Sequence, residues 1–472
     1  EFFGRAQEAV PSIVEITDFM ATHPGGALLA GLEHLDDRYL RAVGYTTKSR
    51  RGGLPKMVLV GDIVGDDERA VARAASEVVR IANARSGEGF IAATPEDGKK
   101  FWHERAKTAA ISRHTNAFKL NEDVVIPLPR MGEYTDAIER INIELSIENK
   151  LELLDALDAY FVSPFALGKT DDIELDRLPR EEILGDRIGR TQELVAFARR
   201  RWQWLLANLD KPVEAAAAEL AGMGYTLPAT AERAGRIVDL LQDHTIRVSW
   251  KTEIRAPLKR IYAGAAFVPV LAECDAIHAR VLRGRVFVAL HMHAGDGNVH
   301  TNIPVNSDNY VMLQRANAAV ARIMQIARSL DGVISGEHGI GITKLEFLDE
   351  AETADFRRYK ERVDPEGRFN KGKLLPGADL RNAYTPSFGL MGHESLIMQQ
   401  SDLKSISDAI KDCLRCGKCK PVCSTHVPGS NLLYSPRNKV LATSLLIEAF
   451  LYEEQTRRGV SIKHWEEFGD VA

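Results

Sequence analysis

Side chains that can bind a metal ion occur in two short glycine-rich segments. Residues 291–300 read HMHAGDGNVH and include His293 and His300, and residues 335–341 read SGEHGIG and include Glu337 and His338. Two imidazoles and a carboxylate suit zinc and other borderline transition metals. We therefore predict that His293, His300 and Glu337 bind one divalent ion, with donor atoms no farther apart than roughly twice a ~2.0–2.2 Å ligand bond.

Two further histidines accompany these candidate ligands. His338 follows Glu337 directly and could act as a general base near neutral pH. Strand alternation makes His291 face as His293 does, either into the site or as a buried, hydrogen-bonded residue. The glycines around His338 are not a dinucleotide-binding fingerprint, because their spacing is wrong.

Four of the five cysteines form a second cluster, Cys-x2-Cys-x2-Cys-x3-Cys, at Cys413, Cys416, Cys419 and Cys423. This is the bacterial ferredoxin spacing, in which the first three thiolates bind one four-iron cluster and the fourth binds a second. The usual proline is replaced by Ser424, and a zinc site is the alternative. Such clustering favours a reducing compartment over disulfides.

Length and charge limit the class of protein. A chain of 472 residues with 45% hydrophobic content predicts two or three domains. The net charge of −5 gives no basic field for nucleic acid. No apolar run approaches the ~20 residues of a membrane span.

The elements around the histidines read as a sheet covered by helices. Residues 286–290 and 301–303 predict two strands joined by the Gly-Asp-Gly-Asn turn. Residues 1–55 have a mostly helical pattern. Further strands are predicted at 57–64, 89–92 and 123–127, and helices at 66–86, 95–106, 132–147 and 308–330. Residues 149–284 lack strand signals and predict a helical insertion.

These motifs resemble one group of flavoproteins. Residues 293–300, 335–341 and 369–376 resemble signatures of the FAD-linked D-lactate dehydrogenase, glycolate oxidase and D-2-hydroxyglutarate dehydrogenase relatives, within the vanillyl-alcohol-oxidase-like superfamily. Residues 101–105 and 122–127 also resemble the C-terminal domain of that group. The resemblance covers roughly 28–145 and 286–377, and residues 403–472 resemble the ferredoxin-like subunit that accompanies glycolate oxidase.

The resemblance implies a fold class and a domain order. We expect an α+β domain with an antiparallel sheet covered by helices, built from residues 1–148 and 285–377 and divided by the insertion at 149–284. A linker at 378–402 would lead to an α-helical iron–sulfur domain at 403–472. Because no FAD-binding domain precedes these parts and the cysteine motif occurs once, we expect the middle of a longer protein, inactive by itself.

The resemblance also implies roles for individual residues. Arg105 would grip a substrate carboxylate, for which the guanidinium fork is suited, and Asn302 would lie on the substrate side. His338 would lie at the substrate beside the metal ligands. The remaining positions, expected to bind the flavin cofactor, are Gly339, Asn370 and Lys373, although Lys371 stands where the family motif has proline.

Together these features predict an FAD- and iron–sulfur-dependent 2-hydroxy-acid dehydrogenase. A divalent metal (zinc, manganese or iron) would polarise the substrate, and electrons would pass from FAD through 4Fe-4S clusters to a quinone, a cytochrome or an electron-transfer protein. The expected location is cytoplasmic, with peripheral association at the inner face of the membrane left open. The alternatives are an electron-transfer scaffold, which should have lost site residues that are all present, and a flavin-free metallohydrolase.

Overall fold

The computed structural model describes two compact units. The sheet unit consists of Glu1–Phe2, Val10–Tyr134 and Ala289–Ala472, and the helical unit of Phe3–Ala9 and Thr135–Val288. The described residues are 1–4, 9–23, 25–106, 118–169, 178–227, 235–305, 310–340, 344–370, 374–375, 422–424, 435–436, 439 and 442. Of residues 104–106, 118–121, 310 and 313 only the backbone is described.

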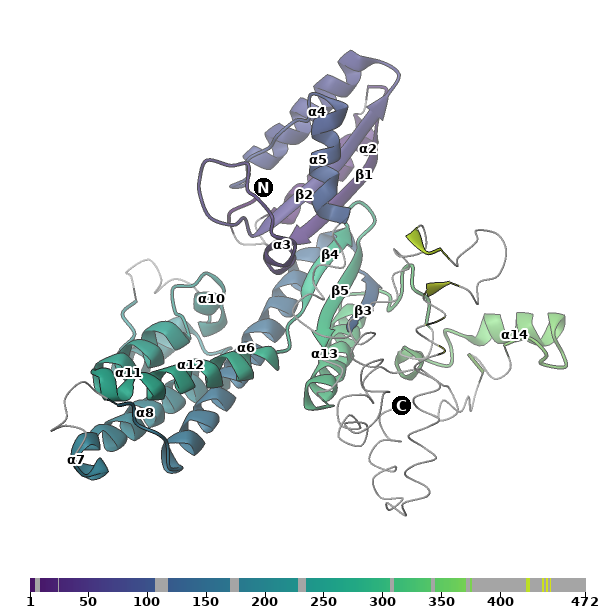
Figure 1. The fold of residues 1–472 in the computed structure, drawn as a ribbon. Helices are drawn as coiled ribbons and strands as arrows, with labels where there is room; N and C mark the ends of the chain where they lie inside the picture. The colour runs from purple at the N-terminus through teal and green to yellow at the C-terminus, as the bar shows by residue number, and fades with distance from the viewer. Residues whose placement is uncertain are drawn as a thin grey trace. The chain divides into compact units, whose positions relative to one another are not determined.

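The sheet unit is built on five antiparallel strands in the order β2-β1-β4-β5-β3 (Figure 1). Their bounds are Ala27–Asp36 (β1), Met57–Gly65 (β2), Phe118–Val125 (β3), Ala289–His293 (β4) and Asn298–Val305 (β5). This arrangement confirms the predicted antiparallel sheet. It also places strands that are far apart in the sequence side by side, since β1 pairs with β4.

The two faces of the sheet differ in chemistry. The register aligns His34 with Met292 and Met292 with Val299, and all three side chains are buried. Neighbouring positions, which point to the opposite face, carry Glu33 and His293. One face is therefore buried and mostly apolar, and the other carries the polar residues of the candidate site.

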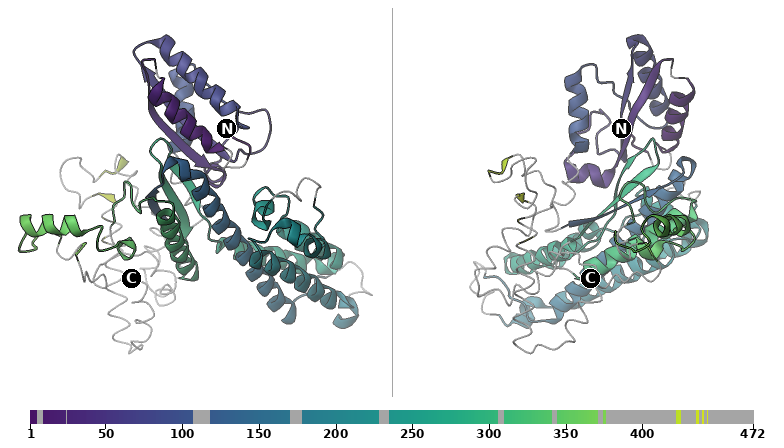
Figure 2. Two further views of the ribbon diagram at one scale, coloured as in Figure 1. Left: turned by 180° about the vertical axis from the view of Figure 1, so that it is seen from behind. Right: turned by 90° about the vertical axis from the view of Figure 1, so that its right-hand side faces the viewer.

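Helices pack on both sides of the sheet. Helices α2 (Pro11–Thr22) and α4 (Glu68–Asn83) contact β1, and α13 (Tyr310–Ser329) contacts β3 and β5. Helix α5 (Pro95–Ala106) lies on the side opposite α2 (Figure 2). It is tied to the polar face because Trp102 Nε1 donates a hydrogen bond of 3.0 Å to Asp62 on β2. Asp62 pairs with Gly31 on β1, and Gly31 is two residues from Glu33 and so lies on the same face.

Local sequence explains two tight connections in this unit. Helix α3 (Asp37–Val43) begins where Asp36 accepts a hydrogen bond of 2.7 Å from the Tyr39 N–H, and it ends at left-handed Gly44. The β4–β5 turn contains Gly297 at φ 71°, where a Cβ would lie 2.3 Å from the Ile126 carbonyl oxygen. Only glycine fits there, and the predicted hairpin is confirmed.

The helical unit has a core of its own around the fully buried Trp202. Asn142 binds both the N–H and the carbonyl of Val288, at 2.8 and 2.9 Å. Within its described residues this unit contains no strand, and the predicted insertion at 149–284 lies inside its bounds. Its helices are α6 (Met131–Val162, which begins in the sheet unit), α7 (Arg180–Leu184), α8 (Arg187–Ala207), α9 (Val213–Gly222), α10 (Ile237–Gln242), α11 (Ala256–Ile261) and α12 (Val268–Arg283), with a π-helical turn at Trp250–Arg255.

Some predicted elements are wrong. The mostly helical reading of residues 1–55 missed β1, because Leu28, Leu32 and Leu35 follow the i, i+4, i+7 spacing of a helix while pairing with β2 and β4 makes the segment a central strand. No strand forms at 89–92, where Ile91 is exposed. The strand predicted at 123–127 is β3, which begins at Phe118 and ends at Val125.

The C-terminal predictions lie almost entirely outside the described residues. Cys413, Cys416 and Cys419 are among the residues not described, whereas Cys423 is partly buried and not in a disulfide. The linker at 378–402 and nearly all of the domain at 403–472 are likewise undescribed, so the iron–sulfur domain stays a prediction. None of the helices in the described part of the chain has the length and hydropathy that crossing a membrane would need. The short helix α14 (Ala354–Val363), which precedes this region, is described.

Candidate metal and active site

The β4–β5 hairpin brings three histidines together on the polar face. The register places His291 opposite His300, and His293 opposite Asn298. The rings of His291 and His300 stack at 4.6 Å, and the rings of His293 and His300 lie 5.3 Å apart. His291 therefore faces as His293 does, but it is buried and stacked on His300.

Glu337 completes a group of three possible metal ligands. Its Oε1 lies 3.0 Å from His293 Nε2, and its Oε2 lies 3.7 Å from His300 Nε2. One donor atom of each residue lies within 4.8 Å of the other two. Ligands on one ion with ~2.0–2.2 Å bonds are at most about 4.4 Å apart, and both contacts of Glu337, at 3.0 and 3.7 Å, are shorter than that.

The chemistry of these donors fits a divalent cation. Burial, followed by the nearby His338, lowers the pKa of His300 to about 4, so its imidazole is neutral at neutral pH, as a metal ligand must be. Its Nδ1 is buried and without a hydrogen-bond partner in the described part of the chain. Both His300 and His293 present Nε2 toward the Glu337 carboxylate, so a cation between these groups could be bound by both imidazoles.

A carboxylate from β1 orients one of the imidazoles. Glu33 Oε1 lies 2.6 Å from His293 Nδ1, and the Glu33 side chain is mostly buried. A neutral imidazole that donates its Nδ1–H to a carboxylate keeps the Nε2 lone pair for a metal. Glu33 was not singled out in the sequence, because it is 260 residues from His293 and no local motif connects them.

A second buried carboxylate holds the loop that carries Glu337 and His338. Asp123 lies opposite His300 in the β3–β5 ladder and accepts hydrogen bonds from the backbone N–H groups of Gly336, Glu337 and His338. Lys344 Nζ lies 2.5 Å from Asp123 Oδ1. The sequence assigned Asp123 no role beyond the strand predicted at 123–127 and the family-like segment 122–127, and Lys344 none at all, because an isolated charged residue gives no local signal of burial.

The residues predicted to act on the substrate have different surroundings. His338 is partly exposed, and its ring lies 4.9 Å from that of His300. Asn302 is fully buried, with Nδ2 2.8 Å from His291 Nδ1 and 3.2 Å from the Ala289 carbonyl. Arg105 belongs to α5, which is tied to the polar face, but its side chain lies outside the described residues.

The predicted flavin-binding residues are only partly described. Gly339 is exposed at φ 74°, and a Cβ added there would meet nothing within 4 Å. Asn370 is exposed and also has a positive φ of 44°. Lys373 lies outside the described residues. Gly339 thus leaves open space beside His338.

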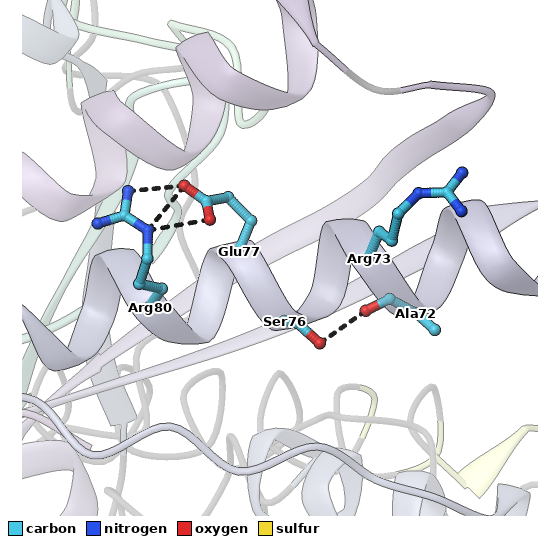
Figure 3. A pocket seen from close by; sticks show the side chains of 5 residues that line it. All are labelled: Ala72, Arg73, Ser76, Glu77 and Arg80. Atoms are coloured by element: carbon cyan, nitrogen blue, oxygen red, sulfur yellow. Dashed lines mark hydrogen bonds and ion pairs between the residues drawn. The ribbon is translucent and has the colours of Figure 1, made fainter.

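A surface hollow on α4 is chemically unlike this site. It is lined by Ala72, Arg73, Ser76, Glu77 and Arg80 (Figure 3). Two of these residues pair with each other, since Arg80 Nη2 lies 2.6 Å from Glu77 Oε1. The Ser76 hydroxyl is likewise satisfied by the Ala72 carbonyl. We therefore assign no function to this hollow.

Comparison with known proteins gives one family and several relatives. The family described as "FAD linked oxidases, C-terminal domain" matches residues 8–149 and 234–374. The mitochondrial D-lactate dehydrogenase [cytochrome] of Arabidopsis thaliana is 34% identical over 88 residues, which are 18% of this chain and 16% of the relative. Glycolate oxidase subunit GlcD of Escherichia coli (strain K12) is 36% identical over 93 residues, 19% of each chain.

A third relative comes from an archaeon. The D-lactate dehydrogenase of Archaeoglobus fulgidus is 39% identical over 89 residues, which are 18% of this chain and 19% of the relative. The aligned segments thus span less than a fifth of each of these three relatives.

Proposed function

Because the chain belongs to the family of FAD-linked oxidases, C-terminal domain, we propose that it supplies the substrate and metal site of a flavoprotein that oxidises a 2-hydroxy acid to the 2-oxo acid. The observation that carries this proposal is the convergence of His293, His300 and Glu337, with His338 beside them. The substrate class comes from the relatives, which are named for D-lactate and glycolate.

The roles of the site residues follow from their chemistry. His293, His300 and Glu337 would hold a divalent metal (zinc, manganese or iron), which when bound acts as a Lewis acid on substrate oxygens. His338, being partly exposed beside the ligands, accepts the proton of the substrate hydroxyl. FAD, when bound, would supply the two-electron acceptor, and the substrate would lose a hydride from C2 together with the hydroxyl proton.

Five further residues complete the proposed site. Arg105 binds the substrate carboxylate through its guanidinium fork, from a helix tied to the polar face by Trp102. Asn302, which is buried against His291, supports the substrate side of the hairpin. Gly339, Asn370 and Lys373 contact the flavin.

The cysteine motif supplies the proposed route for electrons out of the flavin. Cys413, Cys416 and Cys419 bind one 4Fe-4S cluster, and Cys423 binds a second. The acceptor is a quinone, a cytochrome or an electron-transfer protein, reached from the cytoplasm or the inner face of the membrane. Cys423 is partly buried and not in a disulfide, which is compatible with this role.

The test uses the flavin-loaded protein that contains this chain. Under anaerobic conditions, D-lactate, glycolate and D-2-hydroxyglutarate are mixed with it in turn, and flavin absorbance is followed. At least one hydroxy acid should bleach the flavin in the metal-loaded protein, and removal of the metal by a chelator should abolish bleaching. Metal-loaded protein whose flavin is reduced by none of these acids would contradict the proposal.

Two variants separate the roles of base and carboxylate clamp. His338→Gln should slow flavin reduction by about 10²–10⁴-fold, as expected for loss of a general base. Arg105→Lys should mainly raise KM, because a point charge cannot reproduce a bidentate grip. The control is His23→Gln, which changes an exposed histidine at the C-terminal end of α2. In this variant the substrate should reduce the flavin at the wild-type rate.

A further inference from the structure

A buried ion pair lies directly beneath the segment that carries Glu337 and His338. Lys344 Nζ is 2.5 Å from Asp123 Oδ1 and 2.8 Å from the Asp123 carbonyl oxygen, and it is 3.5 Å from Glu122 Oε2. The side chains of Asp123 and Lys344 are at most 1% exposed. Charges this deeply buried are costly to desolvate unless each has a close partner, so this pair calls for a specific explanation.

The second oxygen of Asp123 binds the neighbouring loop. Asp123 Oδ2 accepts hydrogen bonds from the N–H groups of Gly336, at 2.8 Å, of His338, at 3.1 Å, and of Glu337 between them. Three successive N–H groups directed at one anion form a backbone nest. The carboxylate therefore fixes the backbone of the two residues whose side chains enter the site.

The position of Asp123 in the sheet explains why this matters for the site. Asp123 lies opposite His300, and β3 thus connects the loop to the hairpin that carries the imidazoles. At the same place Gly336 fits closely against Asn298, since a Cβ on residue 336 would lie 2.7 Å from Asn298 Oδ1. The loop is held from two sides, by a charge and by a close steric fit.

The charge of Asp123 depends on Lys344. Burial alone would raise the pKa of the Asp123 carboxyl, but the Lys344 ammonium and the loop N–H groups lower it well below its ordinary value. The carboxylate thus remains ionised and able to accept all three N–H groups. Without the ammonium, Asp123 would be buried in an edge strand with no lysine or arginine within salt-bridge distance in the described part of the chain. The Nδ1 atom of His338 lies 3.6 Å from Asp123 Oδ1.

We infer that Asp123 and Lys344 are positioning residues that place Glu337 and His338 relative to the histidine hairpin. This inference rests on the proposed metal site, which it deepens by naming what holds the loop-borne ligand in place. Neither residue needs to touch substrate or metal. Their effect is to limit the freedom of the Glu337 backbone, so that its carboxylate is already directed at His293 and His300 before an ion binds.

The test compares three variants of the full chain: Lys344→Met, Asp123→Asn, and the double variant. Affinity for Zn²⁺ is measured by chelator competition, and thermal unfolding gives stability. Both single variants should lose about 10–100-fold in Zn²⁺ affinity, as commonly happens when a residue that orients a metal ligand is changed. The double variant removes both buried charges, so its Tm should recover toward that of the wild type while its Zn²⁺ affinity stays low.

A matched control is available elsewhere in the sheet unit. Lys360 Nζ lies 2.6 Å from Asp364 and 2.6 Å from the Phe369 carbonyl, which reproduces a mostly buried lysine shared between a carboxylate and a backbone oxygen. Lys360→Met should lower the Tm without changing Zn²⁺ affinity. If Lys344→Met also lowers only the Tm and leaves Zn²⁺ affinity within twofold of wild type, the pair is merely structural and the inference is wrong.

A readout without metal separates this inference from the proposed function. Hydrogen exchange at the amides of Gly336, Glu337 and His338 should be slow in the wild type and faster in the double variant, whether or not Zn²⁺ binds. If the wild type binds no metal but shows this protection, the metal site is wrong and the positioning role stands. Equal exchange in the wild type and the double variant would overturn the positioning role itself.

Discussion

Replacing Glu33 tests whether a residue outside all the recognised motifs sets metal affinity. Its Oε1 lies 2.6 Å from His293 Nδ1, a distance typical of a charge-assisted hydrogen bond. Loss of a residue that hydrogen-bonds to a metal ligand costs about 10–100-fold in metal affinity, which is about 1.4–2.7 kcal/mol. A hydrogen bond to a charged group contributes about 1.5–3 kcal/mol, so the two estimates agree.

We expect Glu33→Ala to weaken Zn²⁺ binding by that full amount, and Glu33→Gln by less. The amide of glutamine retains an oxygen acceptor for the Nδ1–H of His293 but loses the negative charge. Affinity is measured by chelator competition at fixed pH, with Asp62→Asn as the control. Asp62 is a carboxylate of β2 that binds Trp102, so its loss should leave Zn²⁺ affinity unchanged.

Two results would refute this reasoning. If Glu33→Ala binds Zn²⁺ as tightly as the wild type, the 2.6 Å contact does not orient His293 for metal. If Asp62→Asn weakens binding as much as Glu33→Ala, the effect belongs to the general negative charge of this face and not to the contact with His293.

Three further predictions concern other parts of the chain. Burial lowers the pKa of His34 to about 3, so between pH 3 and its ordinary value of 6.5 only the unfolded chain binds the proton, and stability falls as pH falls. Between pH 7 and pH 5 the wild type should therefore lose about 2 kcal/mol more of its free energy of unfolding than His34→Phe does, as measured by urea unfolding. The same pH dependence in both proteins would contradict this. Gly336→Ala would press a Cβ against Asn298, so it should lower the free energy of unfolding by about 1–3 kcal/mol and also weaken Zn²⁺ binding. Unaltered Zn²⁺ binding would show that the loop adapts. Trp202→Ala should destabilise the helical unit by about 3–5 kcal/mol and Trp202→Phe by less, because the indole Nε1 has no partner among the described residues; equal losses in calorimetry would disprove that.

Sequence reasoning worked best where the chemistry is local. The hairpin was predictable because the Gly-Asp-Gly-Asn turn fixes how residues 291 to 300 pair, and Gly297 has the positive φ that such a turn needs. Helices α4 and α5 were placed within a few residues of their bounds, because their apolar spacing and starting residues are contained in the segment itself. Strand β1 was missed because its leucine spacing imitates a helix.

The sequence by itself determined which side chains can bind a metal, since His293, His300 and Glu337 carry that chemistry in two short motifs. It could not determine what orients them. Glu33 meets His293 only through the register of β1 on β4, and Lys344 meets Asp123 across 221 residues. Such pairings produce no periodic pattern in the sequence. A single charged residue is expected to be solvent-exposed, and only the folded sheet and its neighbouring loop show that it is buried. Only the tertiary structure, by removing water from these carboxylates and providing each with a partner, made them part of the site.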